Sequence, residues 1–173
     1  MAATSENLNY APAVLKSKFS YYSAKPAEAD ADGYTKSGNR ITKAANQEAT
    51  ANKAYHKPRL GNDKSDDGWR FRGRGLKQVT GRGNYRDCTH KYQTYWALGA
   101  QNFENSPELL LQFPYSVRSA VWFWESHLCA RAADKGMGDT QVDAISHIVN
   151  SGETGEPHLN RRTYAKKLFD ILN

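Results

Sequence analysis

The sequence predicts a mainly helical fold with one small β element, and three observations lead to this prediction. Apolar residues recur at helical spacing in several segments, and proline or a capping residue stands where many of these segments begin. Six of the 13 glycines lie between Leu60 and Gly83, where short runs of Trp, Phe and Val favour a strand pair. The sequence shows no internal repeat. We therefore expect one helix-rich domain with a glycine-hinged β element.

The first third of the chain contains two candidate helices. Pro12 can occupy the first turn of a helix, because apolar residues follow it at near-helical spacing. The segment 25–40 is rich in Ala, Asp, Gly, Lys and Ser, so it is expected to form an exposed loop. Helix-favouring residues then fill 41–56, and Pro58 and Gly61 end that helix.

The part of the chain after the glycine-rich window is expected to be helical. Most of the predicted helices have a capping residue, a proline or an apolar face. The predictions are a helix over 84–97, one capped by Ser106, one opened by Pro114, one capped by Asp139 or Thr140, and one over 158–172.

Length, composition and charge limit the class of protein. The 173 residues are 39% hydrophobic and 24% charged, which suits a single folded domain. The sequence has neither an apolar run long enough to span a membrane nor a recognisable signal peptide, so we expect either synthesis in the cytoplasm or the loss of a leader. The net charge of +6 favours an anionic partner. Nucleic acid and an anionic cell wall both fit, and charge alone does not choose between them.

Neither a metal nor a cofactor is expected. Cys88 and Cys129 are far apart in sequence and have no neighbouring Cys or His cluster, which predicts two buried thiols. The run Asp63–Gly68 resembles the start of a calcium loop, but Arg74 occupies the twelfth position, where a bidentate Glu is required. The five histidines show no metal-ligand spacing.

The segment Trp69–Tyr85 is the strongest candidate for a functional site. It combines closely spaced glycines with Gln78, Thr80 and Asn84, whose side chains are uncharged hydrogen-bonding groups. Such groups on a ribbon with aromatic neighbours suit a carbohydrate. Arginines that alternate with glycines are equally typical of a solvated basic turn, so the residues by themselves leave both interpretations open.

The run Arg72–Tyr85 resembles the signature of family-19 glycoside hydrolases, which include plant-type chitinases and bacteriophage endolysins. Further stretches resemble the family in the same order, so the likeness spans nearly the whole chain. These stretches are Glu6–Tyr10, Ala51–Tyr55, Gly61–Asn62, Asp67–Trp69, Pro107–Leu110, Ala120–Trp124 and Ile148–Gly152, followed by Arg161 and Arg162. The Glu-Asn-Leu-Asn-Tyr form of the first stretch is closest to the endolysin branch.

The resemblance implies a lysozyme-like, two-lobed and mostly helical fold with a cleft for β-1,4-linked polymers that contain N-acetylglucosamine. It also implies an inverting mechanism, in which one carboxylic acid protonates the leaving oxygen and a second carboxylate activates water. We expect residues 1–173 to form a single catalytic domain that lacks its first helices. The expected activity is that of an endolysin that cuts peptidoglycan, with chitin as the alternative polymer.

By position, the resemblance also implies roles for individual residues. Glu6 matches the general base, and Thr80 matches the hydroxyl residue that helps to hold the water. The residues expected to bind substrate are Gln78, Asn84, Tyr85, Trp69, Arg74, Asn150, Arg161 and Arg162, with Asn150 and one of the two arginines on the far wall of the cleft. Without the resemblance, Glu6 would be interpreted as a solvated or helix-capping residue.

The general acid of the family is a glutamate on a helix before the Glu-Asn-Leu-Asn-Tyr element, and residues 1–5 contain no carboxylate. Three explanations are open: a fragment of a longer enzyme, which we favour; a degenerate homologue that binds without cleaving; or an acid from elsewhere. The nearest candidates for a replacement acid are Glu48, Asp66 and Asp67, each of which is expected to be a surface charge.

Two other functions are compatible with parts of the sequence. Arginines cluster around glycines and aromatic residues near 70–86, as in some nucleic-acid-binding proteins, and a wall-binding module without catalysis is a third class. We expect a polysaccharide partner, with no nucleic acid and no membrane insertion, and a monomer. The protein is expected to act on the cell wall, in the periplasm, after its release from the cytoplasm.

Overall fold

The computed structural model describes residues 4–96, 101–150 and 155–172, and it is mainly helical with a single two-stranded hairpin among these residues. The predicted fold class is therefore confirmed. Two compact units are present, Met1–Trp122 and Phe123–Asn173, and each is described by itself. The prediction of one catalytic domain over 1–173 stays a prediction.

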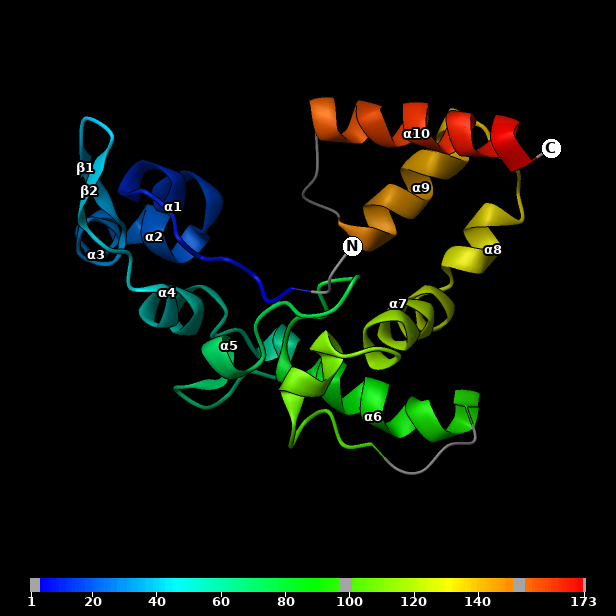
Figure 1. Cartoon of the computed structure of the whole chain (residues 1–173), viewed down its shortest axis with the longest axis horizontal. Helices are drawn as coiled ribbons and strands as arrows, with labels where there is room; N and C mark the ends of the chain where they lie inside the picture. The colour runs from blue at the N-terminus through cyan, green and yellow to red at the C-terminus, as the bar shows by residue number, and fades with distance from the viewer. Residues whose placement is uncertain (1–3, 97–100, 151–154, 173) are drawn as a thin grey trace. The chain divides into compact units, whose positions relative to one another are not determined.

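The first unit begins with a cluster of short helices, visible in blue and cyan in Figure 1. It contains α1 (Pro12–Lys18), α2 (Ser20–Ala24), α3 (Pro26–Asp32) and α4 (Gln47–Ala54). Pro12 begins α1, as predicted, because its fixed φ suits the first turn. These helices share a buried core, which consists of Leu8, Leu15, Phe19, Tyr22, Ala29, Ala51 and Ala54.

The β hairpin lies elsewhere than predicted. Strand β1 (Thr35–Ser37) pairs in antiparallel fashion with β2 (Arg40–Lys43). The segment 25–40 that was predicted to be a loop thus contains both β1 and α3. Most of β2 lies in the segment 41–56 that was predicted to be a helix, of which only Gln47–Ala54 is helical. Both strands are exposed, so no alternation of apolar residues marks them in the sequence. The tight turn between them contains Gly38 at a φ of 57°, a conformation that glycine adopts without strain.

The glycine-rich window contains no strand pair among its residues, which corrects the prediction. It holds a short 3-10 helix, η1 (Pro58–Leu60), the single-turn helix α5 (Asp67–Arg70) and one isolated antiparallel bridge between Arg74 and Val79. The glycines let this segment fold back on itself closely. A Cβ on Gly81, for example, would lie 2.8 Å from the carbonyl oxygen of Leu60.

Helix α6 (Arg82–Trp96) carries the second part of the core of this unit, together with η2 (Pro107–Leu111). Tyr85, Cys88 and Tyr92 are buried at helical spacing along α6. The predicted helix over 84–97 is confirmed as far as Trp96, and Ala97 lies outside the described residues. The element after Ser106 is a 3-10 helix, and Ser106 makes no side-chain cap.

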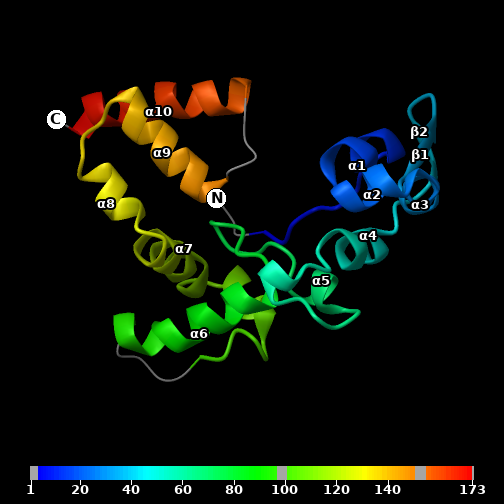
Figure 2. The same ribbon diagram turned by 180° about the vertical axis from the view of Figure 1, so that it is seen from behind.

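Helix α7 (Tyr115–Ser126) follows Pro114, as predicted, and continues into the second unit. The second unit also holds α8 (Cys129–Ala133), α9 (Asp139–Val149) and α10 (Glu156–Leu172). Helices α9 and α10 lie side by side in Figures 1 and 2, and Arg162 forms an ion pair with Asp143 across them. The N-cap of α9 is Gly138 and not the predicted Asp139 or Thr140.

The two cysteines and the lengths of the helices can be compared with the sequence analysis directly. Cys88 and Cys129 are buried free thiols, as predicted. Burial raises the pKa of Cys88 to about 12, because the thiolate would lack solvation. Within the described ranges, no helix is long and apolar enough to cross a membrane.

Candidate active site

Glu6 lies against Gly73, although the two residues are 67 positions apart. The backbone N–H of Glu6 donates to the carbonyl oxygen of Gly73 at 2.7 Å, and the N–H of Gly73 donates to Glu6 Oε2 at 3.2 Å. The hydroxyl of Tyr55 donates to the other carboxylate oxygen, Oε1, at 2.5 Å. Both oxygens of the predicted base therefore have a donor, and the side chain is only partly buried.

Tyr55 directly follows α4, and the packing of its ring holds its hydroxyl in place. The ring packs edge-on against Phe19 with centroids 6.0 Å apart. Burial raises the pKa of Tyr55, and the nearby charge of Glu6 raises it further. The hydroxyl is therefore a stable donor, and the group that accepts from it is the carboxylate.

Gly73 is also the point at which the predicted catalytic and binding residues converge. A Cβ at this position would lie 2.7 Å from Gln78 Oε1, and 3.3 Å from both Glu6 Cβ and Thr80 Oγ1. Glycine is required here because any side chain would occupy this space. Glu6, Gln78 and Thr80 thus surround one backbone position, and the roles that the resemblance implies for them stay predictions.

Gln78 is held in a strained conformation, with φ at 58°. Its amide nitrogen donates to the carbonyls of Thr4 and Gly75, at 2.8 and 3.0 Å. Thr80 Oγ1 donates to the carbonyl of Gln78 at 3.0 Å. We refer to the glycine-rich segment Trp69–Tyr85 as the ribbon. The ribbon therefore fixes both side chains beside Glu6. The hydrogen bond to Thr4 connects the ribbon to the segment that carries Glu6.

Asn84 extends the same ribbon into α6. Its amide nitrogen donates to the carbonyl of Thr80 at 2.8 Å, and the side chain is half-buried. Tyr85, one residue further, is fully buried. Its hydroxyl donates to the carbonyl of Arg72 at 2.9 Å and accepts from Arg74 at 3.1 Å. Burial raises the pKa of Tyr85 to about 12, and the charge of Arg74 opposes the rise. Asn84 and Tyr85 thus both make internal hydrogen bonds to the ribbon.

Trp69 and Arg72 form a stacked pair at the start of the ribbon. The guanidinium of Arg72 lies 3.7 Å from the centroid of the Trp69 ring and donates to the carbonyl of Trp69. The backbone N–H of Trp69 donates to Asn52 Oδ1 at 2.7 Å. Burial lowers the pKa of Arg72, as does the neighbouring charge of Arg74, while Glu6 and Glu48 act in the opposite direction.

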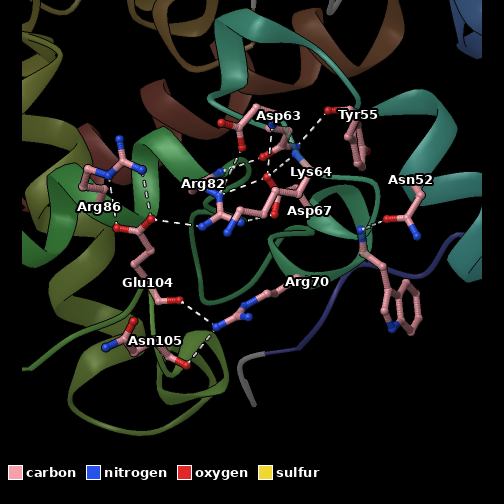
Figure 3. A network of polar contacts seen from close by, with 12 residues as sticks. Asn52, Tyr55, Asp63, Lys64, Asp67, Arg70, Arg82, Arg86, Glu104 and Asn105 are labelled. Carbon is pink, nitrogen blue, oxygen red and sulfur yellow. Dashed lines mark hydrogen bonds and ion pairs between the residues drawn. The ribbon is translucent and has the colours of Figure 1, made fainter.

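A network of charged side chains around Asp67 and Arg82 contacts the ribbon (Figure 3). The side chain of Asp67 is fully buried and pairs with Arg82 through both oxygens, so the prediction that Asp67 is a surface charge is wrong. Burial acts to raise the pKa of Asp67, but the hydrogen bond from Arg82 and the N–H groups of Lys64 and Asp63 outweigh it and lower the pKa.

Two further residues extend this network. Glu104 pairs with Arg82 at 3.2 Å and with Arg86 at 2.9 Å, and these bonds lower its pKa. Asn62 connects the network to Tyr55, because its amide donates to the Tyr55 carbonyl and its oxygen accepts from the N–H of Arg82, both at 2.8 Å. The position of the base partner Tyr55 thus depends on the network around Arg82.

A pocket of about 360 Å³ opens beside the ribbon. It brings Glu48 and Asp66, two of the three candidate replacement acids, next to the Trp69–Arg72 pair. Both carboxylates are exposed, as predicted. The residues that line the pocket are Glu48, Asp66, Trp69, Arg70, Arg72, Arg74, Asn105, Pro107 and Glu108.

The remaining predicted site residues belong to the second unit. Asn150 follows α9 as its C-cap and is exposed. Arg161 and Arg162 are half-buried on α10, and hydrogen bonding to Asp143 raises the pKa of Arg162. Their predicted roles in substrate binding stay predictions.

Two residues of the site were missed by the sequence analysis, namely Tyr55 and Gly73. Both stood in stretches that carried the family resemblance, but only the fold shows that they contact Glu6. A search of the described residues finds no group of three or more His, Cys, Asp or Glu side chains that could hold a metal ion.

Comparisons with known proteins concern the family resemblance. No family model matches the sequence. A glycosyl hydrolase family 19 domain-containing protein of Haemophilus influenzae is 32% identical over 152 residues, which cover 87% of this chain. The chain spans 62% of the length of that relative. This match confirms the resemblance of the chain to the family-19 glycoside hydrolases.

Proposed function

We propose that this chain is a glycosidase of the endolysin type, which cleaves β-1,4 bonds in the glycan of peptidoglycan by inversion, with chitin as the alternative polymer. The observation that supports this most strongly is the environment of Glu6. Its two carboxylate oxygens accept from Tyr55 and Gly73, and Gln78 and Thr80 lie beside it. A carboxylate that two donors hold in place is oriented to accept a proton from a bound water.

In this proposal Glu6 removes a proton from the attacking water. Thr80 donates its own hydroxyl proton to the carbonyl of Gln78, so the oxygen lone pairs of Thr80 can accept from that water. The leaving oxygen is protonated by a second carboxylic acid, which in inverting hydrolases is roughly 6.5–9.5 Å from the base. Water therefore attacks from the face opposite to the leaving group, and the configuration at the anomeric carbon inverts.

Two arginines near the end of the ribbon argue against nucleic acid. Arg82 and Arg86 already pair with carboxylates. Guanidinium groups with such partners exchange existing bonds when they bind phosphates, which reduces the gain in affinity. The net charge of +6 would instead help the protein to approach an anionic wall after release from the cytoplasm.

The test uses a substrate whose departure needs no proton from the protein, so that it reports on the base. We expect the chain to hydrolyse the β-fluoride of a chitooligosaccharide, with release of fluoride and an α-configured product seen by NMR. Glu6→Gln should slow fluoride release by about a hundredfold or more. The matched control, Glu156→Gln, removes an exposed carboxylate in the second unit and should release fluoride at the parental rate.

Three outcomes would contradict the proposal: no hydrolysis by the parent, a β-configured product, or equal rates for the parent and Glu6→Gln. A parallel assay with purified peptidoglycan and with chitin measures the release of reducing ends from each polymer. If the chain binds a polymer but releases neither fluoride nor reducing ends, it is a wall-binding homologue instead.

A further inference from the structure

The pocket beside the ribbon is lined by charged side chains of both signs. Three guanidiniums, from Arg70, Arg72 and Arg74, face a pocket that three carboxylates also line. The carboxylates belong to Glu48, Asp66 and Glu108. We refer to this site as the mixed-charge pocket. Its volume of about 360 Å³ is within the range of small-ligand sites.

The charges of the mixed-charge pocket do not neutralise one another through ion pairs. In the part of the chain that the structure describes, no nitrogen of its three arginines lies within 4.0 Å of a carboxylate oxygen. Arg70 instead donates to the carbonyls of Glu104 and Asn105, as Figure 3 shows. By contrast, the adjacent network around Arg82 is fully ion-paired.

Two of the guanidiniums are also partly removed from water. Arg74 is 6% exposed, and its buried Nε has no hydrogen-bond partner. Arg72 lies flat on Trp69, and burial lowers its pKa. A partly desolvated cation without an anion is unfavourable, so the negative charge of an anion in the pocket would stabilise both groups, even where the guanidinium itself is buried. Glu48, by contrast, has an exposed carboxylate, which could bind a cation.

We infer that the mixed-charge pocket binds the stem peptide of peptidoglycan, which carries several carboxylates and, where it is not cross-linked, a free ammonium group. This inference rests on the proposed function and specifies its substrate. Chitin has no charged group, so it would leave all six charged side chains of the pocket without an ionic partner. The charges of the pocket therefore favour peptidoglycan over chitin.

The position of the pocket agrees with this assignment. Arg72 immediately precedes Gly73, whose N–H donates to the Glu6 carboxylate. A stem peptide in the pocket would therefore lie next to the sugar whose bond Glu6 acts on. The peptide would contribute binding energy that a bare glycan lacks, and the pocket would orient the peptidoglycan strand in the site.

The experiment measures the binding of a soluble, uncross-linked tripeptide stem that ends in a diamino acid, by isothermal titration calorimetry on the whole chain. We expect binding that weakens as salt is raised, because the contacts are ionic. Glu48→Gln and Arg70→Gln should each weaken binding by about tenfold. Both residues are exposed, so their replacement should leave the fold intact, which circular dichroism verifies. Glu156→Gln is the matched control and should bind as the parent does.

The outcomes separate this inference from the proposed function. Hydrolysis of the chitooligosaccharyl fluoride by the parent without any binding of the tripeptide would overturn the inference and leave the function standing. Binding of the tripeptide that Glu48→Gln and Arg70→Gln weaken, without hydrolysis by the parent, would support the pocket and contradict the function. Binding that neither variant changes would place the peptide elsewhere and overturn the inference.

Discussion

Glu6 and Gly73 exchange two hydrogen bonds, one between their backbones and one from the Gly73 N–H to the Glu6 carboxylate. This pair connects the start of the chain to the glycine-rich ribbon. It places the base candidate at a backbone position that also lies close to Gln78 and Thr80. The geometry of the site therefore depends on the absence of a side chain at residue 73.

Gly73→Ala is expected to impair activity more than stability. The new Cβ would lie 2.7 Å from Gln78 Oε1, so Gln78 and its neighbours must move by a few tenths of an ångström or more. Displacements of this kind in a site can cost about a hundredfold in rate. The rate of fluoride release and the midpoint of thermal unfolding measure the two effects. Gly138→Ala is the control, because its Cβ would meet only the flexible end of Gln141. Equal activity of Gly73→Ala and the parent would contradict the convergence of the site at this glycine.

Tyr55→Phe tests the second donor to Glu6. The variant keeps the ring that packs on Phe19 but loses the hydroxyl that donates to Oε1. Glu6 Oε1 then lacks the donor that fixes the orientation of the carboxylate. We expect the rate of fluoride release at neutral pH to fall by about tenfold.

The matched control for this hydroxyl is Tyr10→Phe. Tyr10 packs on the same Phe19 ring, with centroids 5.9 Å apart, and its hydroxyl makes no hydrogen bond to Glu6. Its rate of fluoride release should therefore equal that of the parent. If Tyr55→Phe also releases fluoride at the parental rate, the hydroxyl has no influence on the base.

The sequence predicted the helices well wherever a local signal marked them. Pro12 and Pro114 stand at helix starts, as the sequence predicted. The hairpin was misplaced because β1 and β2 bury neither face, so their sequence lacks the alternation that marks a strand. The Trp, Phe and Val residues of the ribbon indicated strands, but the glycines between them fold the backbone into turns.

The site was predictable only in part, because its contacts join distant segments. Nothing local to Glu6 indicates that it meets Gly73 or Tyr55; the family resemblance alone singled it out. Asp67 was expected on the surface, since an aspartate is rarely buried without a partner. Its partner Arg82 is 15 positions away, and only the folded backbone brings the two together.

Asp67→Ala is expected to destabilise the chain by about 3–5 kcal/mol. It would leave the guanidinium of Arg82 without its buried partner, and unpaired buried charges are costly. The free energy of unfolding in urea measures this change. Arg86→Met removes an exposed partner of Glu104 and should cost far less, because solvent screens exposed ion pairs. Similar losses for the two variants would contradict the structural role assigned to Asp67.

The same network predicts how stability depends on pH. The pKa values of Asp67 and Glu104 are lowered in the folded state, so at acidic pH the unfolded chain binds more protons than the folded chain. Their contribution is therefore complete above the unfolded pKa values, which lie near about 4, and is lost as the pH falls through the folded values. The urea midpoint should be nearly constant above about pH 5 and decline below it. Asp67→Asn should decline less steeply than the parent, because the amide does not titrate. A decline of the same slope in both proteins would show that other carboxylates govern the acid limb.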